Sequence, residues 1–227
     1  MIEGKKSIGV ICDFDGPLFD ADALLQSIRD TITQGNTKNI EQFNTLYTQN
    51  KKDIPTLINA LHEQFSLGRD ALALFFESDI APFLRSESRE FIASMEEEIA
   101  DFHIITKGDP LFQQSKLDRL SLKGTPLEEK NTFIVNEIQK MKKKGINRIL
   151  IIDDKISELQ KVFDTLPEEF RPFVQFIHME VGRHGKEGTA SDALLPYMKT
   201  ITHLSEINPL LPQKEGNHMY REPGMVK

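Results

Sequence analysis

The chain has 227 residues, enough for one core domain or for one domain that carries a smaller insertion. Apolar residues make up 39% of it, and 28 lysines and arginines stand against 35 aspartates and glutamates, which gives a formal net charge of −7. This acidic balance argues against a broad surface for nucleic acid or for anionic membranes, because both require an excess of basic residues.

The lengths of the apolar runs and the cysteine content favour a location in the cytoplasm. No run is long enough to span a membrane or to form the apolar part of a secretory signal. Cys12 is the only cysteine, so the chain cannot form an internal disulfide, which fits a reducing cytoplasm. We therefore expect a cytoplasmic protein without membrane or nucleic-acid partners, whose oligomeric state the sequence does not indicate.

The first apolar run ends in two carboxylates. Residues 8–12 are predicted to form a short buried strand, and Asp13 and Asp15 follow at its C-terminal end. Side chains two residues apart on a strand point to the same side, so these carboxylates lie close together. Such like charges repel unless a cation or a shared proton lies between them. The pair is therefore interpreted as a site, with a solvated turn as the alternative.

The chain then changes to helical patterns. Residues 21–85 have apolar residues at helical spacing in four places and no convincing strand, which predicts an insertion of four short helices. A further helix is expected over residues 87–100. The next apolar run, residues 102–105, ends in Thr106, and Asp109-Pro110 then has the residue types that begin a helix.

The second half repeats this alternation. A capping-box pattern predicts a helix over residues 125–144, with Lys130 as the only charge on its apolar stripe. Residues 148–152 form a third apolar run, which ends in Asp153 and Asp154. A fourth strand is expected over residues 173–178, a helix over 194–198, a shorter helix near Leu204 and a loosely ordered, flexible tail over 212–227.

Strands that are apolar throughout and alternate with helices predict an α/β fold, a three-layer Rossmann-like parallel sheet with an inserted helical unit. Ligands of such sheets lie outside the carboxyl ends of the strands. The polar residues at that predicted edge are Asp13, Asp15, Thr106, Asp153 and Asp154.

Four carboxylates at one edge favour a hard divalent cation, and Mg²⁺ suits best because it takes oxygen ligands and substrate phosphate. One carboxylate could then attack phosphorus and form an aspartyl-phosphate. Asp15 would protonate the leaving oxygen and later deprotonate water. Thr106 and the amides after it could hold phosphoryl oxygens, and the Lys130 ammonium would balance negative charge.

These residues resemble the motifs of the haloacid dehalogenase-like (HAD) hydrolases. The sequence DFDG at residues 13–16 is similar to the first motif of that family, Thr106 to the second, Lys130 to the third and Asp153-Asp154 to the fourth. The resemblance spans roughly residues 7–180. It implies a core domain of residues 1–20 and 86–211, and a helical cap of residues 21–85 of the C1 type.

The resemblance also implies roles for single residues. Asp13 would be the nucleophile and Asp15 the general acid and base. Mg²⁺ would be bound by the Asp13 carboxylate, the Asp15 main-chain carbonyl and Asp154, with Asp153 in support. The substrate would be a small phosphorylated metabolite, because family members that act on halides generally lack the second aspartate.

Two features of the motifs leave questions open. The family usually has Thr or Val where this chain has Pro17, so we expect a stiffer loop after the nucleophile. Lys107 is expected to help hold phosphate, and Lys107, Lys116 and Lys155 are alternatives to Lys130 as the motif lysine. A phosphatase is the main functional hypothesis. The alternative is a non-catalytic or regulatory relative that binds phosphate, metal or a partner through the cap.

Overall fold

A six-stranded parallel sheet forms the centre of the protein, in the order β3-β2-β1-β4-β5-β6. The structure, a computed structural model, describes residues 7–67, 70–182 and 188–211. The predicted tail at 212–227 lies outside these residues. The strands are β1 (Ile8–Asp13), β2 (Asp101–Lys107), β3 (Thr125–Leu127), β4 (Arg148–Asp153), β5 (Val174–Met179) and β6 (Met198–Ile201).

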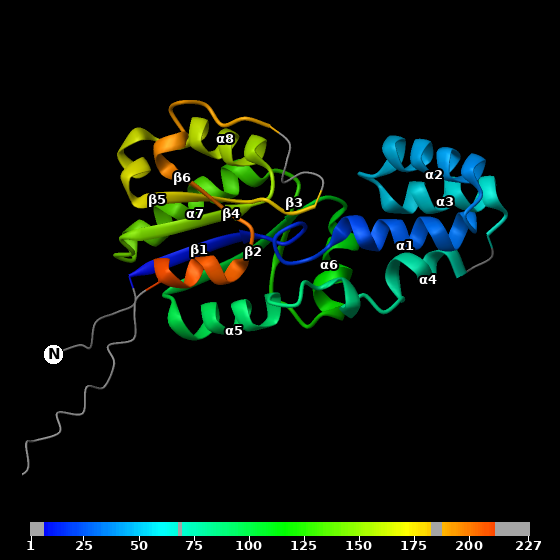
Figure 1. The fold of residues 1–227 in the computed structure, drawn as a ribbon, viewed down its shortest axis with the longest axis horizontal. Coiled ribbons are helices and arrows are strands. Elements are labelled where there is room, and N and C mark those ends of the chain that lie inside the picture. The colour runs from blue at the N-terminus through cyan, green and yellow to red at the C-terminus, as the bar shows by residue number, and fades with distance from the viewer. Residues whose placement is uncertain (1–6, 68–69, 183–187, 212–227) are drawn as a thin grey trace, which may run out of the picture.

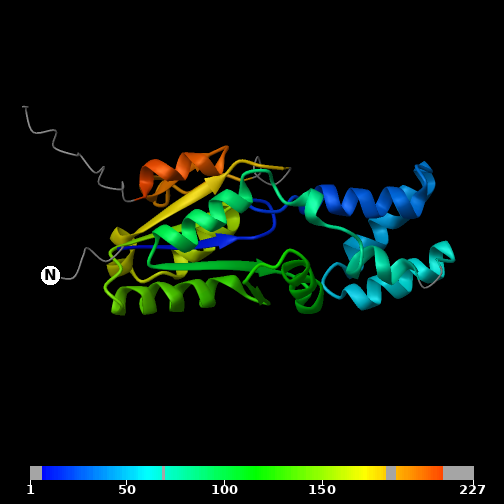
Figure 2. The ribbon, with the colours of Figure 1, turned by 90° about the horizontal axis from the view of Figure 1, so that it is seen from below.

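Helices cover both faces of the sheet, as Figures 1 and 2 show. One face carries α7 (Lys130–Lys143) and α8 (Ile156–Thr165), and the other carries α5 (Ser88–Glu98) and a 3₁₀ helix at Leu204–Leu210. Two buried apolar clusters fill the space between the sheet and these two helix layers. The predicted three-layer α/β architecture is therefore confirmed. Other 3₁₀ helices occur at Ala81–Phe83, Glu168–Phe173 and Leu195–Tyr197.

Four helices lie beyond the carboxyl edge of the sheet, on the right in Figure 1. They are α1 (Ala21–Thr33), α2 (Thr37–Asn50), α3 (Ile54–Phe65) and α4 (Asp70–Phe76), the four expected in the insertion. Helix α6 (Pro110–Arg119), which follows β2, lies between them and the sheet. That α1 to α4 form a separate cap domain remains a prediction.

The segments that lead into and out of these four helices are bonded to each other. The amide of Asp20 donates to the carbonyl of Phe83, and the amide of Arg85 donates to the carbonyl of Leu18. The two linkers therefore run side by side at the edge of the sheet.

Two sequence predictions are wrong. The helix expected to begin at Thr125 begins at Lys130, with the Glu129 side chain as its cap, because residues 125–127 pair with the end of β2 as strand β3. The helix expected over 194–198 is a single 3₁₀ turn followed by β6, which pairs with β5. Among the described residues, no helix combines the length and the apolar character that crossing a membrane requires.

Candidate active site

Three aspartates meet at the carboxyl ends of the two central strands. Asp13 ends β1, Asp153 ends β4 and Asp154 follows directly. One carboxylate oxygen from each lies within 4.8 Å of the others, and all three residues are buried. Because β1 and β4 are neighbouring parallel strands, the topology alone brings their carboxyl ends together.

Lys130 joins this cluster from the first turn of α7. Its Nζ atom lies 2.7 Å from Oδ2 of Asp13 and 3.2 Å from Oδ2 of Asp153, and the lysine is 3% exposed. The remaining oxygen of Asp13 accepts from the amide of Phe14 at 2.9 Å, and that of Asp153 from the amide of Lys155 at 2.9 Å. Of the four lysines that the sequence left open, Lys130 is the one paired with Asp13.

The cluster carries more negative than positive charge. Burial raises the pKa of Asp13 to about 8, Lys130 opposes this rise, and the charges of Asp153 and Asp154 add to it. Burial and the neighbouring Asp153 raise the pKa of Asp154 to about 7. Burial lowers the pKa of Lys130, but the carboxylates of Asp13 and Asp153 outweigh it and hold that pKa above its ordinary value.

A divalent cation fits this donor set. Three buried carboxylates face one ammonium group, so an added positive charge would relieve their repulsion. Oδ1 of Asp154 is buried and has no hydrogen-bond partner among the described residues. Carboxylate oxygens are the ligands that Mg²⁺ takes in proteins.

Gly16 leaves room for Asp154. Its backbone has a φ of +104°, and a Cβ atom there would lie 2.4 Å from Cγ of Asp154. Nε of Arg85 donates to the carbonyl of Gly16 at 2.6 Å and so holds the loop that follows Asp15. Only glycine satisfies both the backbone conformation and the close approach.

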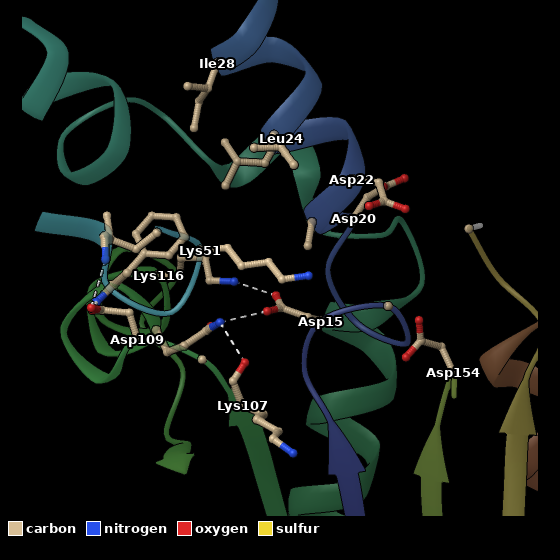
Figure 3. Close-up of a pocket in the computed structure, with 18 of the residues that line it drawn as sticks. Asp15, Asp20, Asp22, Leu24, Ile28, Lys51, Lys107, Asp109, Lys116 and Asp154 are labelled. Carbon is tan, nitrogen blue, oxygen red and sulfur yellow. Dashed lines mark hydrogen bonds and ion pairs between the residues drawn. The ribbon is translucent and has the colours of Figure 1, made fainter. Parts of the chain in front are cut away.

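The two other residues expected to bind phosphate differ in their surroundings. Thr106 is fully buried, and its hydroxyl has no hydrogen-bond partner among the described residues, so it is free to donate to a ligand oxygen. The Lys107 ammonium lies 3.8 Å from Glu158 and 4.0 Å from Glu129. Figure 3 shows the Lys107 side chain directed away from Asp15, so the structure does not bring it to the acidic cluster.

Asp15 has different partners from the other aspartates. Its Oδ1 atom lies 2.5 Å from Nζ of Lys116 (Figure 3). Its Oδ2 atom accepts from Nε2 of Gln113 at 3.0 Å. Sequence reasoning considered Lys116 only as an alternative to Lys130, and it missed Gln113. The spacing of three residues on the helix after Thr106 was the available signal, since it puts both side chains on one helix face.

A cavity of about 320 Å³ opens beside Asp15, Gly16 and Asp154. Its opposite wall comes from the inserted helices, with Leu24 and Ile28 of α1 among the apolar lining residues (Figure 3). Gly182, in the segment after β5, also lines the cavity. The space therefore connects the acidic cluster with the inserted helices.

Several solved structures share the fold of this chain. A putative haloacid dehalogenase-like hydrolase from Burkholderia xenovorans LB400 has a TM-score of 0.65 and 15% identity, covering 90% of this chain and 96% of its own. A dehalogenase has a TM-score of 0.54 and 14% identity, covering 94% and 100%. CbbY from Rhodobacter sphaeroides, in complex with phosphate, has a TM-score of 0.51 and 12% identity, covering 89% and 96%.

These likenesses confirm the fold that the motifs implied. No protein-family model matches the chain, and no curated protein matches it. At identities of 12 to 15%, the similarity establishes the architecture, and the chemistry has to be argued from the residues at the site.

Proposed function

We propose that this chain, which has the fold of the haloacid dehalogenase-like hydrolases, is a member of that family and a Mg²⁺-dependent phosphomonoester hydrolase of the cytoplasm. Its substrate would be a small phosphorylated metabolite. The observation that carries the proposal is the meeting of Asp13, Asp153, Asp154 and Lys130 at the edge of the sheet, next to a cavity.

Asp13 is the nucleophile in this proposal. Its carboxylate oxygen attacks phosphorus, and the bond from phosphorus to the leaving oxygen breaks, which leaves an aspartyl-phosphate on Asp13. Asp15 gives a proton to the leaving oxygen and then takes one from the water that attacks the phosphoenzyme. This second attack releases inorganic phosphate and restores the Asp13 carboxylate.

The side chains around Asp13 would stabilise the negative charge of the phosphoryl group. Lys130 fixes the Asp13 carboxylate and offsets negative charge on the phosphoryl group, and the Thr106 hydroxyl donates to a phosphoryl oxygen. Mg²⁺, held by Asp13, Asp154 and the carbonyl of Asp15, would neutralise charge on the phosphate when bound. Both carboxylate oxygens of Asp153 already accept hydrogen bonds, Oδ2 from Lys130 and Oδ1 from the amide of Lys155, which suits a supporting role.

Similarity to a dehalogenase makes halide removal the competing reaction. Asp15 favours the phosphatase, because a leaving oxygen needs a proton and a leaving halide does not. Asp15 lines the cavity, where its carboxylate could reach a leaving group.

The deciding experiment is hydrolysis of 4-nitrophenyl phosphate by the full chain, with MgCl₂ or with EDTA. We expect Mg²⁺-dependent turnover that Asp13→Asn abolishes and that the exposed control Asp192→Asn retains. Acid quenching should trap a phosphoenzyme that Asp13→Asn does not form. Full activity in Asp13→Asn would disprove the nucleophile. Chloride release from 2-chloropropionate would favour a dehalogenase, and phosphate binding without turnover would favour the non-catalytic alternative.

A further inference from the structure

Helix α6 holds both oxygens of the Asp15 carboxylate. Lys116 and Gln113 approach it from one face of that helix, and the amide nitrogen of Gln113 also lies 3.3 Å from the carbonyl of Lys107. The side chain of Asp15 is 21% exposed, so water could satisfy its oxygens without either partner. Two donors on two oxygens fix the plane of the carboxylate, which water would leave free.

The position of Lys116 is unfavourable for a lysine. The residue is 1% exposed, and its Nζ atom lies 5.3 Å from the ring centroid of Phe14, 5.1 Å from that of Phe19 and 5.3 Å from that of Phe112. A methionine of similar length would fill this aromatic space without the desolvation of a charge. Cation–π attraction to the three rings offsets part of the desolvation cost of the ammonium, and the Asp15 carboxylate forms an ion pair with it.

The same helix also contacts the inserted helices that wall the cavity. Asp109, which caps α6, accepts from the amide of Ile54 at the start of α3, at 3.2 Å. At the other end of α6, Nη1 of Arg119 donates to the carbonyl of Phe75 at 2.8 Å. Helix α6 is therefore bonded to the inserted helices at both of its ends, which makes it a suitable support for a group that must meet a bound substrate.

We propose that Lys116, assisted by Gln113, is the positioning residue for Asp15. It acts through Asp15 by holding the carboxylate at the cavity, in the orientation needed to pass a proton to the leaving oxygen and later to accept one from water. This inference rests on the proposed phosphatase function.

Lys116→Met tests the proposal with two substrates. Glycerol 2-phosphate has a poor leaving group that needs a proton, whereas 4-nitrophenyl phosphate has a good one. Because general acid catalysis contributes about 10² to 10⁴ in rate, we expect kcat for glycerol 2-phosphate to fall by about 10² and kcat for 4-nitrophenyl phosphate by less than about tenfold. KM should change little for either substrate. An equal fall with both substrates, or no fall, would overturn the proposal.

A matched control and a double variant separate positioning from general damage. Lys123→Met removes an exposed lysine just beyond α6 and should behave like the wild type. Adding Lys116→Met to Asp15→Asn should cause no further loss, because the lysine acts only through the aspartate. Losses that multiply in the double variant would contradict the proposal.

The orientation of Asp15 gives a readout that does not depend on turnover. Crystal structures should show the carboxylate on Lys116 and Gln113 in the wild type and rotated or disordered in Lys116→Met. An unchanged carboxylate in the variant refutes the positioning role, even if the wild type shows no Mg²⁺-dependent hydrolysis and the proposed function fails. If urea unfolding shows that Lys116→Met does not fold, Gln113→Leu takes its place. We expect a smaller fall in kcat for Gln113→Leu, again larger with glycerol 2-phosphate than with 4-nitrophenyl phosphate. An equal fall with both substrates, or no fall, would refute the positioning role.

Discussion

Lys130 reaches Asp13 from the first turn of the helix that follows β3, and 2.7 Å separates its Nζ atom from Oδ2 of that carboxylate. Both side chains are almost completely buried, at 3% and 2% exposure. An ion pair at such depth is strongly destabilised when only one partner is removed, because the other charge is left without compensation.

Lys130→Met should therefore reduce both activity and stability. We expect a loss of about 10² or more in kcat, the scale seen when one electrostatic group is removed from an active site. The free energy of unfolding should fall by about 3 to 5 kcal/mol, as for other broken buried pairs. Kinetics and urea denaturation measure the two effects. Lys143→Met, an exposed change on the same helix, is the control, and equal behaviour of the two variants would contradict the assignment.

Metal-free protein should lose stability as the pH rises. The pKa values of Asp13 and Asp154, about 8 and about 7, lie above their ordinary value of 3.8, so the folded state binds protons that the unfolded state has released. The stability that these two groups contribute is full below the ordinary value and is lost as the pH rises through their folded values. One pKa unit corresponds to about 1.4 kcal/mol, so titration of the two groups between about pH 5.5 and about pH 8.5 should remove roughly 5 kcal/mol of stability.

Thermal melting in EDTA measures this effect. The Tm should fall by about 10 °C or more between about pH 5.5 and about pH 8.5, given about 2 to 4 °C for each kcal/mol in a chain of this size. Added Mg²⁺ should raise the Tm more at the higher pH, because the cation binds the ionised carboxylates. Asp13→Asn should flatten the pH dependence and Asp192→Asn should preserve it. A Tm that rises with pH in EDTA would disprove the interpretation.

Gly16→Ala should disrupt the acidic cluster. The added Cβ atom would meet the carboxylate of Asp154 at 2.4 Å and displace it, so we expect at least about a tenfold loss of activity and weaker Mg²⁺ binding. Gly35→Ala is a matched control, since Gly35 also has a positive φ, +75°, but has no atom within 4 Å of the added carbon. Calorimetric titration measures the Mg²⁺ affinity of the two variants. If both variants bind Mg²⁺ equally well, Asp154 is not displaced.

Asp109→Ala should loosen the attachment of α3. The change removes the helix cap of α6, worth about 1 kcal/mol, and the acceptor of the Ile54 amide. Hydrogen exchange at the Ile54 amide should accelerate, because the start of α3 opens more often once this contact is lost. Asn36→Ala removes the cap of α2 and should leave exchange at Ile54 unchanged. Unchanged exchange in Asp109→Ala would show that the contact does not hold α3.

Much of the architecture follows from the order of residue types. Each apolar run that ends in a polar residue became a strand of one parallel sheet, and parallel strands end at the same edge. This topology is sufficient to bring Asp13 and Asp153 together, although 140 positions separate them. Lys130 was identifiable because a charge on an apolar stripe needs a buried partner.

The errors occur where tertiary pairing overrides local signals. Thr125-Pro126 has the residue types of a helix start, but its backbone groups pair with Ile105–Lys107. The strand at Met198–Ile201 has four residues and lies at the edge of the sheet, so it carries little pattern of its own. The partnership of Lys116 with Asp15 depends on how α6 packs against Phe14 and Phe19, which no local pattern specifies.

The two linkers of the inserted helices have a consequence for how this architecture can vary. Hydrogen bonds between residues 18–20 and 83–85 fix the spacing of the exit and return points, whatever the chain does in between. Shorter, longer or unrelated insertions could be exchanged there during evolution without altering the register of β1. The acidic cluster at the end of the sheet could thereby stay unchanged while the inserted helices that line the cavity differ.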